Sequence, residues 1–279
     1  MTLADAAELS LKAGDPAAAL AQLQEQVRAK PADARLRIFL FQLLCVVGQW
    51  ERALNQLSVA AGLDAGALAM AQTYGDAVRC AAVRDDVFDG KRSPMIFGQP
   101  DQWLALLIES LLVGGRGERE RSQALRAGAF EEAPASSGAI DGRPFAWIAD
   151  ADSRLGPVVE AVINGRYYWV PFSRLTAVQI EPPEDLRDLV WMPAHLHFEN
   201  GGESVALIPT RYPGSEHCDD GLIRLARKTV WEEMAPDAHR GLGQRVLATD
   251  AEDTSLMEIR SITLVPSDAG TTDPPGPNG

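Results

Sequence analysis

The sequence has few of the features that mark secreted, membrane-spanning or disulfide-stabilised proteins. Only three cysteines, Cys45, Cys80 and Cys218, occur among 279 residues, which suits a reducing compartment and argues against a disulfide framework. The two longest apolar runs, 38–47 and 104–113, contain polar interruptions and are too short to cross a bilayer. The first eleven residues have neither a basic nor an apolar stretch, so no signal peptide is expected.

Positive charge is also scarce. The formal net charge is −13, and it is uneven, because residues 1–97 carry −1 whereas residues 140–279 carry −10. An acidic surface without a basic stripe repels phosphate backbones. We therefore expect no nucleic-acid partner, and the short apolar runs predict no membrane insertion.

A ten-residue stretch near the start of the chain occurs twice, at 14–23 and 48–57. A spacing of about 34 residues is the period of tetratricopeptide (TPR) repeats, in which each unit is a pair of antiparallel helices. Glycine fits the turn between such helices, alanine lets them approach closely, and leucine buries their inner faces. The repeat predicts two stacked helical hairpins, with two unrelated amphipathic hairpins as the alternative. Four positions match, each 34 residues apart: Gly14 and Gly48, Ala19 and Ala53, Leu20 and Leu54, and Leu23 and Leu57.

The first half of the chain has helical periodicity throughout. Its segment 35–44 is apolar almost all round, and such a helix must be covered on more than one side. The expected helices are 3–13 and 16–29 in the first hairpin, 33–47 and 50–62 in the second, and then 66–84, 100–113 and 118–129.

Short strands replace helices in the second half. Asn164-Gly165 lies between two strand-like segments, 158–163 and 166–170, and is a strong signal for a tight hairpin. Segment 222–234 fits either a helix or a strand. Further strands are expected at 173–180, 189–192, 195–198, 204–208 and 256–265.

These patterns predict an α+β protein, with N-terminal TPR-like helical hairpins followed by a small twisted β-sheet or partial-barrel domain. The expected TPR-like helical domain covers 1–133, a linker covers 134–139, and a β-rich C-terminal domain covers 140–266. The tail at 267–279 is rich in Pro, Gly, Asp and Thr, and we expect it to be disordered.

His195 and His197 are the best candidates for a metal site. Alternate residues of a strand point to the same face, so the two imidazoles could converge on a cation, with His217 and Cys218 further along the chain. Zinc sites usually show tighter ligand pairs, however, and a histidine pair at a strand edge is commonly solvated. No bound metal is expected.

Asp150 and Asp152 begin like a calcium loop, but Arg154 stands where the third ligand belongs. The favoured interpretation is that these carboxylates cap a strand-to-turn corner and pair with Arg154, Arg166 or Arg174. The sequence has no nucleophile elbow and no complete dinucleotide fingerprint, so we expect no catalytic residue and no cofactor. The alternative is a metal-dependent hydrolase that uses Asp150, Asp152, His195 and His197.

Several long blocks of the second half resemble the ImpE/TagJ family, also called SciE-type virulence proteins. The resemblance extends over the chain to about residue 265 and is strongest from 145 to 250. Its blocks are Phe145-Ala-Trp-Ile-Ala-Asp-Ala-Asp-Ser-Arg-Leu-Gly156, Asn164-Gly-Arg-Tyr-Tyr-Trp-Val-Pro-Phe172, Glu181-Pro-Pro-Glu-Asp-Leu-Arg-Asp-Leu-Val-Trp191, Arg211-Tyr-Pro-Gly-Ser215, Gly241-Leu-Gly-Gln-Arg245 and Ala248-Thr-Asp250.

The resemblance implies an accessory component of the bacterial type VI secretion system. Members of this family are cytoplasmic, have TPR-like N-terminal helices and are not known as enzymes. They bind the small sheath subunit TssB through an N-terminal helix of that partner, which links them indirectly to the ClpV disaggregase. We therefore expect a non-enzymatic adaptor that binds a TssB-like subunit by a helix-in-groove contact and assists sheath assembly or turnover. A generic TPR scaffold is a further alternative.

A TPR groove binds peptides through the first helix of each hairpin, where an apolar floor and a charged rim suit an amphipathic helix. One departure from the TPR pattern is Phe41, at a position that usually holds a small residue, so the second hairpin is expected to be skewed. The residues placed on the partner-binding face are Asp5, Glu8, Leu11 and Lys12 in the first hairpin and Arg35, Ile38, Phe39, Gln42, Cys45 and Val46 in the second.

Overall fold

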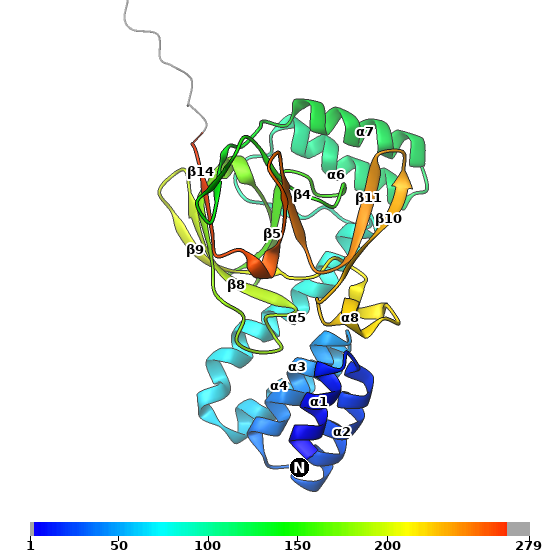
Figure 1. The fold of residues 1–279 in the computed structure, drawn as a ribbon, viewed down its shortest axis with the longest axis vertical. Helices are drawn as coiled ribbons and strands as arrows, with labels where there is room; N and C mark the ends of the chain where they lie inside the picture. The colour runs from blue at the N-terminus through cyan, green and yellow to red at the C-terminus, as the bar shows by residue number, and fades with distance from the viewer. Residues whose placement is uncertain (1–2, 267–279) are drawn as a thin grey trace, which may run out of the picture.

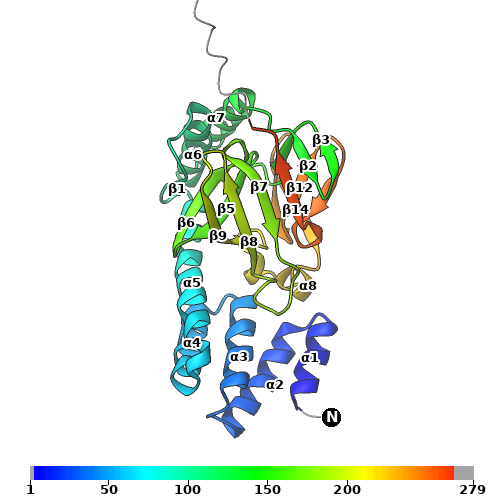
Figure 2. The ribbon, with the colours of Figure 1, turned by 90° about the vertical axis from the view of Figure 1, so that its left-hand side faces the viewer.

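The structure, a computed structural model, describes residues 3–266, with side chains from Ala6 onward. Helices α1–α4 lie at one end of the molecule and α6–α7 at the other, with the β-sheets between them (Figures 1 and 2). This mixed architecture confirms the predicted α+β class. The tail at 267–279, expected to be disordered, lies outside the described residues.

The helices of the first half match the predicted hairpins. Asp15 and Asp33 accept hydrogen bonds from main-chain amides at the starts of α2 and α3 and so cap these helices. Gly14 and Gly48 occupy the turns with φ of +82° and +68°, a conformation that favours glycine. The helices are α1 Leu3–Lys12, α2 Pro16–Ala29, α3 Ala34–Val46, α4 Trp50–Leu63, α5 Leu68–Phe88, α6 Gln102–Gly115 and α7 Arg119–Glu132.

The repeat residues pack as expected of stacked hairpins. Ala19 and Ala53 are fully buried, as is Leu23, so α1 lies close to α2 and α3 close to α4. Phe41 is also buried, and its ring meets that of Tyr74 edge-on at a centroid distance of 6.3 Å. Helix α5 thus accommodates the large side chain that the TPR pattern did not lead us to expect.

Most strands belong to one open sheet. Over residues 3–266 it has nine strands in the order β1-β6-β5-β9-β8-β7-β14-β2-β3. Asn164 and Gly165 have φ of +49° and +72° and form the predicted tight turn between β5 and β6. The strands of this sheet are β1 Met95–Ile96, β2 Gly138–Ile140, β3 Arg143–Phe145, β5 Val158–Ile163, β6 Arg166–Pro171, β7 Leu175–Ile180, β8 Trp191–Phe198, β9 Glu203–Pro209 and β14 Ser261–Leu264.

Two smaller sheets complete the second half. One pairs β10 with β11, and the other has the order β13-β12-β4. Segment 222–234 fits both of its possible interpretations, since the short helix α8 Gly221–Arg224 precedes β10. The strands of these sheets are β4 Ile148–Asp150, β10 Thr229–Ala235, β11 Ala238–Gly243, β12 Val246–Thr249 and β13 Asp253–Ser255.

Two strand predictions were wrong in detail. Segments 189–192 and 195–198 are not separate strands, because β8 runs through Pro193. The carbonyl of Pro193 accepts a hydrogen bond from Glu181 N at 3.1 Å, at the point where β7 ends, so the missing proline N–H interrupts little pairing. The start of 256–265 forms a turn of 3₁₀-helix before β14.

Two apolar clusters cover the two faces of the large sheet. The first contains Phe41, Trp103 and Trp169 and joins the helices to the sheet, whereas the second contains Phe172 and Leu247 and joins the large sheet to β12. The helices and the sheet therefore share one core. No helix within 3–266 has the length and apolar character needed to cross a membrane.

Candidate functional site

A groove separates the first helices from the sheet. It has a volume of about 470 Å³ and lies between α1, α3 and the loop that connects β7 to β8. Five of the ten predicted partner-binding residues line it: Glu8, Leu11, Lys12, Phe39 and Gln42. The opposite wall, which the sequence interpretation missed, consists of Pro183, Glu184, Asp185, Leu186, Leu189, Arg227 and Met257.

The other predicted residues do not line this groove. Arg35 is exposed at the start of α3, and Ile38 is half-buried. Cys45 and Val46 are completely buried at the end of α3, where their carbonyls accept hydrogen bonds from Arg211. TPR spacing assumes that the whole first helix of a hairpin is available to a ligand, but here Arg211 binds the last turn of α3. Asp5 lies in α1, outside the residues whose side chains are described.

The groove has an apolar floor and a charged rim. Leu11 is buried, and Phe39 and Leu186 are half-buried, so the surface between α1, α3 and the loop is apolar. Glu8 and Lys12 are exposed on the rim. An amphipathic helix needs such a surface, because its apolar face buries area while its polar face stays in water.

The loop that forms the second wall is internally fixed. The buried carboxylate of Asp188 accepts hydrogen bonds from the main-chain amides of Glu184, at 2.6 Å, and Asp185, at 3.0 Å. Arg187 pairs with Asp185 and stacks over the ring of Tyr74, with its Cζ 4.7 Å from the centroid. These contacts place Leu186 in the groove wall without any partner present.

A buried ionic cluster lies deeper in the molecule. Arg245, which is 2% exposed, pairs with both Asp150 and Glu160. Arg84 of α5 binds the Glu160 carboxylate through Nε at 2.6 Å and Nη2 at 2.9 Å. The phenol of Tyr167 donates a further hydrogen bond to Glu160 at 2.5 Å. The cluster therefore ties a helix, β4, β5 and the start of β12 together.

Charges within this cluster set the protonation of its acids. Burial raises the pKa of Glu160, but the positive charges of Arg84 and Arg245 outweigh that effect and lower its pKa to about 2. Burial raises the pKa of Asp150 to about 6 against the charge of Arg245. Glu160 has the lower pKa because it binds two guanidinium groups, whereas Asp150 binds only one, which it shares with Glu160.

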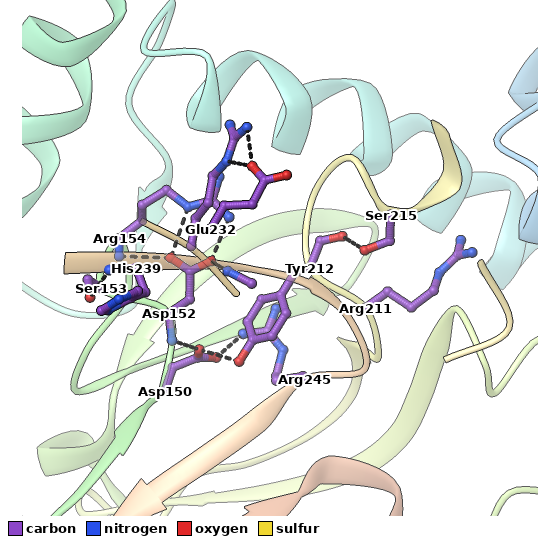
Figure 3. Close-up of polar contacts among 12 residues, drawn as sticks. Asp150, Asp152, Ser153, Arg154, Arg211, Tyr212, Ser215, Glu232, His239 and Arg245 are labelled. Carbon is purple, nitrogen blue, oxygen red and sulfur yellow. Dashed lines mark hydrogen bonds and ion pairs between the residues drawn. The ribbon is translucent and has the colours of Figure 1, made fainter. Parts of the chain in front are cut away.

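The turn after β4 is held by a second buried ion pair (Figure 3). Arg154 binds Asp152 through Nε at 2.9 Å and Nη2 at 2.6 Å, so one of the three predicted arginines forms such a pair, whereas Asp150 pairs with Arg245. Asp152 also accepts a hydrogen bond from Gly241 N at 2.9 Å, and Ser153 accepts one from His239 N at 3.0 Å. Both carboxylates that resembled a calcium loop are thus occupied by protein groups.

The histidines pair separately. His195 lies 3.8 Å from Glu181, and His197 lies 3.2 Å from Glu203. Within residues 3–266, no three His, Cys, Asp or Glu side chains come together in a way that could hold a metal ion. The four residues of the hydrolase alternative therefore do not form a common site in the described part of the chain.

A family model and a known protein are both similar to this chain in sequence. The sequence model of the family described as ImpE protein matches residues 142–263. A protein of Pseudomonas aeruginosa strain PAO1, named type VI secretion system accessory component TagJ, is 52% identical over 268 residues, which are 96% of this chain and 94% of TagJ.

A solved structure is similar over nearly the whole length. The crystal structure of protein VPA1032 from Vibrio parahaemolyticus superposes with a TM-score of 0.85 and covers 94% of this chain and 98% of its own. Its sequence identity is 24%, so this likeness supports the fold and nothing further.

Proposed function

The chain belongs to the ImpE family of type VI secretion accessory components, and from this membership we propose that it is a non-enzymatic adaptor for the secretion sheath. It binds the small, TssB-like sheath subunit by taking an amphipathic helix of that subunit into the groove. In doing so it assists sheath assembly or turnover in the bacterial cytoplasm, with an indirect link to the ClpV disaggregase.

The groove is the observation that carries this proposal. It has a volume of about 470 Å³ and combines the apolar residues Leu11, Phe39 and Leu186 with exposed charges at its rim. These properties match the helix-in-groove mode of recognition, in which a few apolar anchors supply most of the affinity. Both walls are fixed within the protein, so little ordering is required on binding.

The hydrolase alternative gains no support from the geometry of its residues. Asp150 and Asp152 are buried and paired with arginines, and His195 and His197 each face a separate glutamate. The scaffold alternative differs only in having no defined peptide ligand. Capture of the sheath subunit from a lysate by wild-type protein separates it from the adaptor.

The proposal is tested with Phe39→Asp and a synthetic peptide that carries the N-terminal helix of the small sheath subunit. A charge in the groove floor removes one apolar anchor, and we expect the affinity to fall at least about 30-fold, as for an interface hot spot. Titration calorimetry measures the affinity, and circular dichroism checks that the variant is folded.

Phe130→Asp is the matched control. Phe130 is an exposed phenylalanine of α7, a helix at the opposite end of the molecule from α1–α4 (Figure 1), and its substitution should leave peptide affinity unchanged. Equal affinity of the wild type and a folded Phe39→Asp variant would contradict the placement of the partner in this groove.

A further inference from the structure

Residues 211–227, which we call the docking segment, contact both helical hairpins. At the turn of the first hairpin, a Cβ on Gly14 would lie 2.8 Å from Leu222 Cδ2, and at the turn of the second a Cβ on Gly48 would lie 2.7 Å from Glu216 Cγ. The two glycines of the sequence repeat are therefore the points where the docking segment meets the helices. A larger residue at either position would force the side chain of Leu222 or Glu216 to shift.

The first helix of each hairpin ends on an arginine of this segment. Arg227 Nη1 donates to the carbonyls of Leu11, at 2.8 Å, and Lys12, at 3.3 Å, in the last turn of α1. Carbonyls at the end of a helix carry partial negative charge. The carbonyl of Leu11 also accepts a hydrogen bond from Gly14 N at 3.0 Å, and the guanidinium adds a positively charged donor at this end of α1.

Arg211 makes the equivalent contact with α3. Its Nη1 donates to Val46 O at 2.7 Å and its Nη2 to Cys45 O at 3.3 Å, and it also donates to the carbonyl of Arg224. Arg211 is 3% exposed, and burial lowers its pKa to about 10. The negative charge of Glu216 opposes this effect of burial and favours the charged guanidinium.

Helices α1 and α3 form the groove wall opposite the loop, yet they are not each other's main packing partners. Helix α1 packs mainly on α2, and α2 on α3. The docking segment therefore provides a second link between the ends of α1 and α3, and Arg227 of this link also lines the groove.

We propose that Arg227 is a positioning residue that fixes the end of α1 relative to α3 and so sets the width of the groove. The predicted effect of Arg227 on peptide binding rests on the function proposed above. Its predicted effect on the end of α1 does not depend on any partner. Both hydrogen bonds come from Nη1 of Arg227, which lies at the end of a guanidinium that stays charged and planar, whereas the ammonium of a lysine is a compact charge on a flexible stem.

The test compares Arg227→Met, which keeps most of the stem but removes the donors, with Arg227→Lys. Arg240→Met is the matched control, because Arg240 pairs with Glu232 across β10 and β11. Hydrogen exchange in the free protein reports on the amides of Ala13 and Gly14, which close the end of α1. Titration calorimetry with the sheath-subunit helix peptide reports on the groove.

In Arg227→Met we expect exchange at Ala13 and Gly14 to be at least about 10-fold faster and peptide affinity about 10-fold lower, because one charge-assisted contact is lost. Arg227→Lys should recover part of both, and Arg240→Met should change neither. If Arg227→Met fails to fold, Arg227→Lys provides both measurements.

Unchanged exchange at the end of α1 would overturn the proposal, and so would faster exchange with unchanged peptide affinity. A wild type that does not bind the peptide would count against the proposed function alone. The exchange measurement would still support or overturn the positioning of α1 by Arg227.

Discussion

The groove and the buried ionic cluster both assemble charged side chains from distant parts of the chain, but in opposite surroundings. In the cluster, Asp150, Glu160 and Arg245 are at most 3% exposed, and each is paired within the protein. On the groove rim, Glu8 and Lys12 are exposed. Charges in the cluster have no capacity left for a ligand, whereas those on the rim are accessible to one.

The blocks of sequence that resemble the ImpE/TagJ family contribute residues whose charges are paired within the protein. Asp152 and Arg154 from the first block form a buried pair, Arg211 binds the end of α3, and Asp188 fixes the groove loop. These residues hold the architecture together. The apolar anchors of the groove, Phe39 and Leu186, depend on that architecture for their positions.

The largest expected effect comes from breaking the cluster with Arg245→Leu. This change leaves Asp150 without its cation and Glu160 with only Arg84, and removal of one partner from a buried ion pair costs about 3–5 kcal/mol. Urea unfolding should show this loss in the free energy of unfolding, whereas Arg240→Leu at an exposed pair should cost below about 1 kcal/mol. Equal losses in the two variants would remove the distinction between cluster and surface.

A smaller effect is expected at Asp85, which lies beside the docking segment and lines a small cavity together with Glu216. Burial, and then the charge of Glu216, raises its pKa to about 6 from an ordinary value of 3.8. The folded state thus favours the protonated acid, so this group's contribution to stability is present below about pH 3.8 and is lost as the pH rises through about 6.

Asp85→Asn should remove this pH-dependent loss of stability, because asparagine does not ionise. We expect the variant to be more stable than the wild type at pH 7.5, by on the order of 1 kcal/mol because solvent screens a partly exposed group, and equally stable at pH 3.5. Thermal unfolding at both pH values measures the difference. A stabilisation that is the same at the two pH values would show that charge at Asp85 is not its cause.

The smallest effects are expected at the histidines of β8. His195→Ala and His197→Ala each remove one contact between a partly exposed imidazole and a glutamate, and even charged surface pairs are worth roughly 0–1 kcal/mol. Urea unfolding should detect little change, and elemental analysis should find the same metal content in both variants and the wild type. A drop in bound metal in either variant would revive the metal-dependent alternative.

Local sequence signals predicted local structure well. Asn164-Gly165 placed a hairpin because both residues adopt positive φ readily, and the repeat glycines placed two helical turns. Pro193 misled the strand prediction, because only the tertiary arrangement shows that β7 has ended opposite it. Proline disrupts a strand only where the neighbouring strand would need a main-chain N–H from that position. The sequence alone does not show which positions of a strand have such a neighbour.

The candidate site was only half predictable. Helical spacing placed Phe39 and Leu11 on one face, but it carries no information about which distant segment covers that face. Leu186 and Leu189, more than 130 residues away in sequence, form the other wall. The burial of Cys45 and Val46 by the docking segment escaped prediction for the same reason.

The central claim is that a sheath-subunit helix binds between the two walls. Titration calorimetry of the sheath-subunit helix peptide with Leu186→Asp tests it most directly, because Leu186 belongs to the wall that the loop between β7 and β8 supplies. The account predicts an affinity at least about 10-fold below that of the wild type, comparable in direction with Phe39→Asp. Wild-type affinity in a folded Leu186→Asp variant would contradict a groove with two walls.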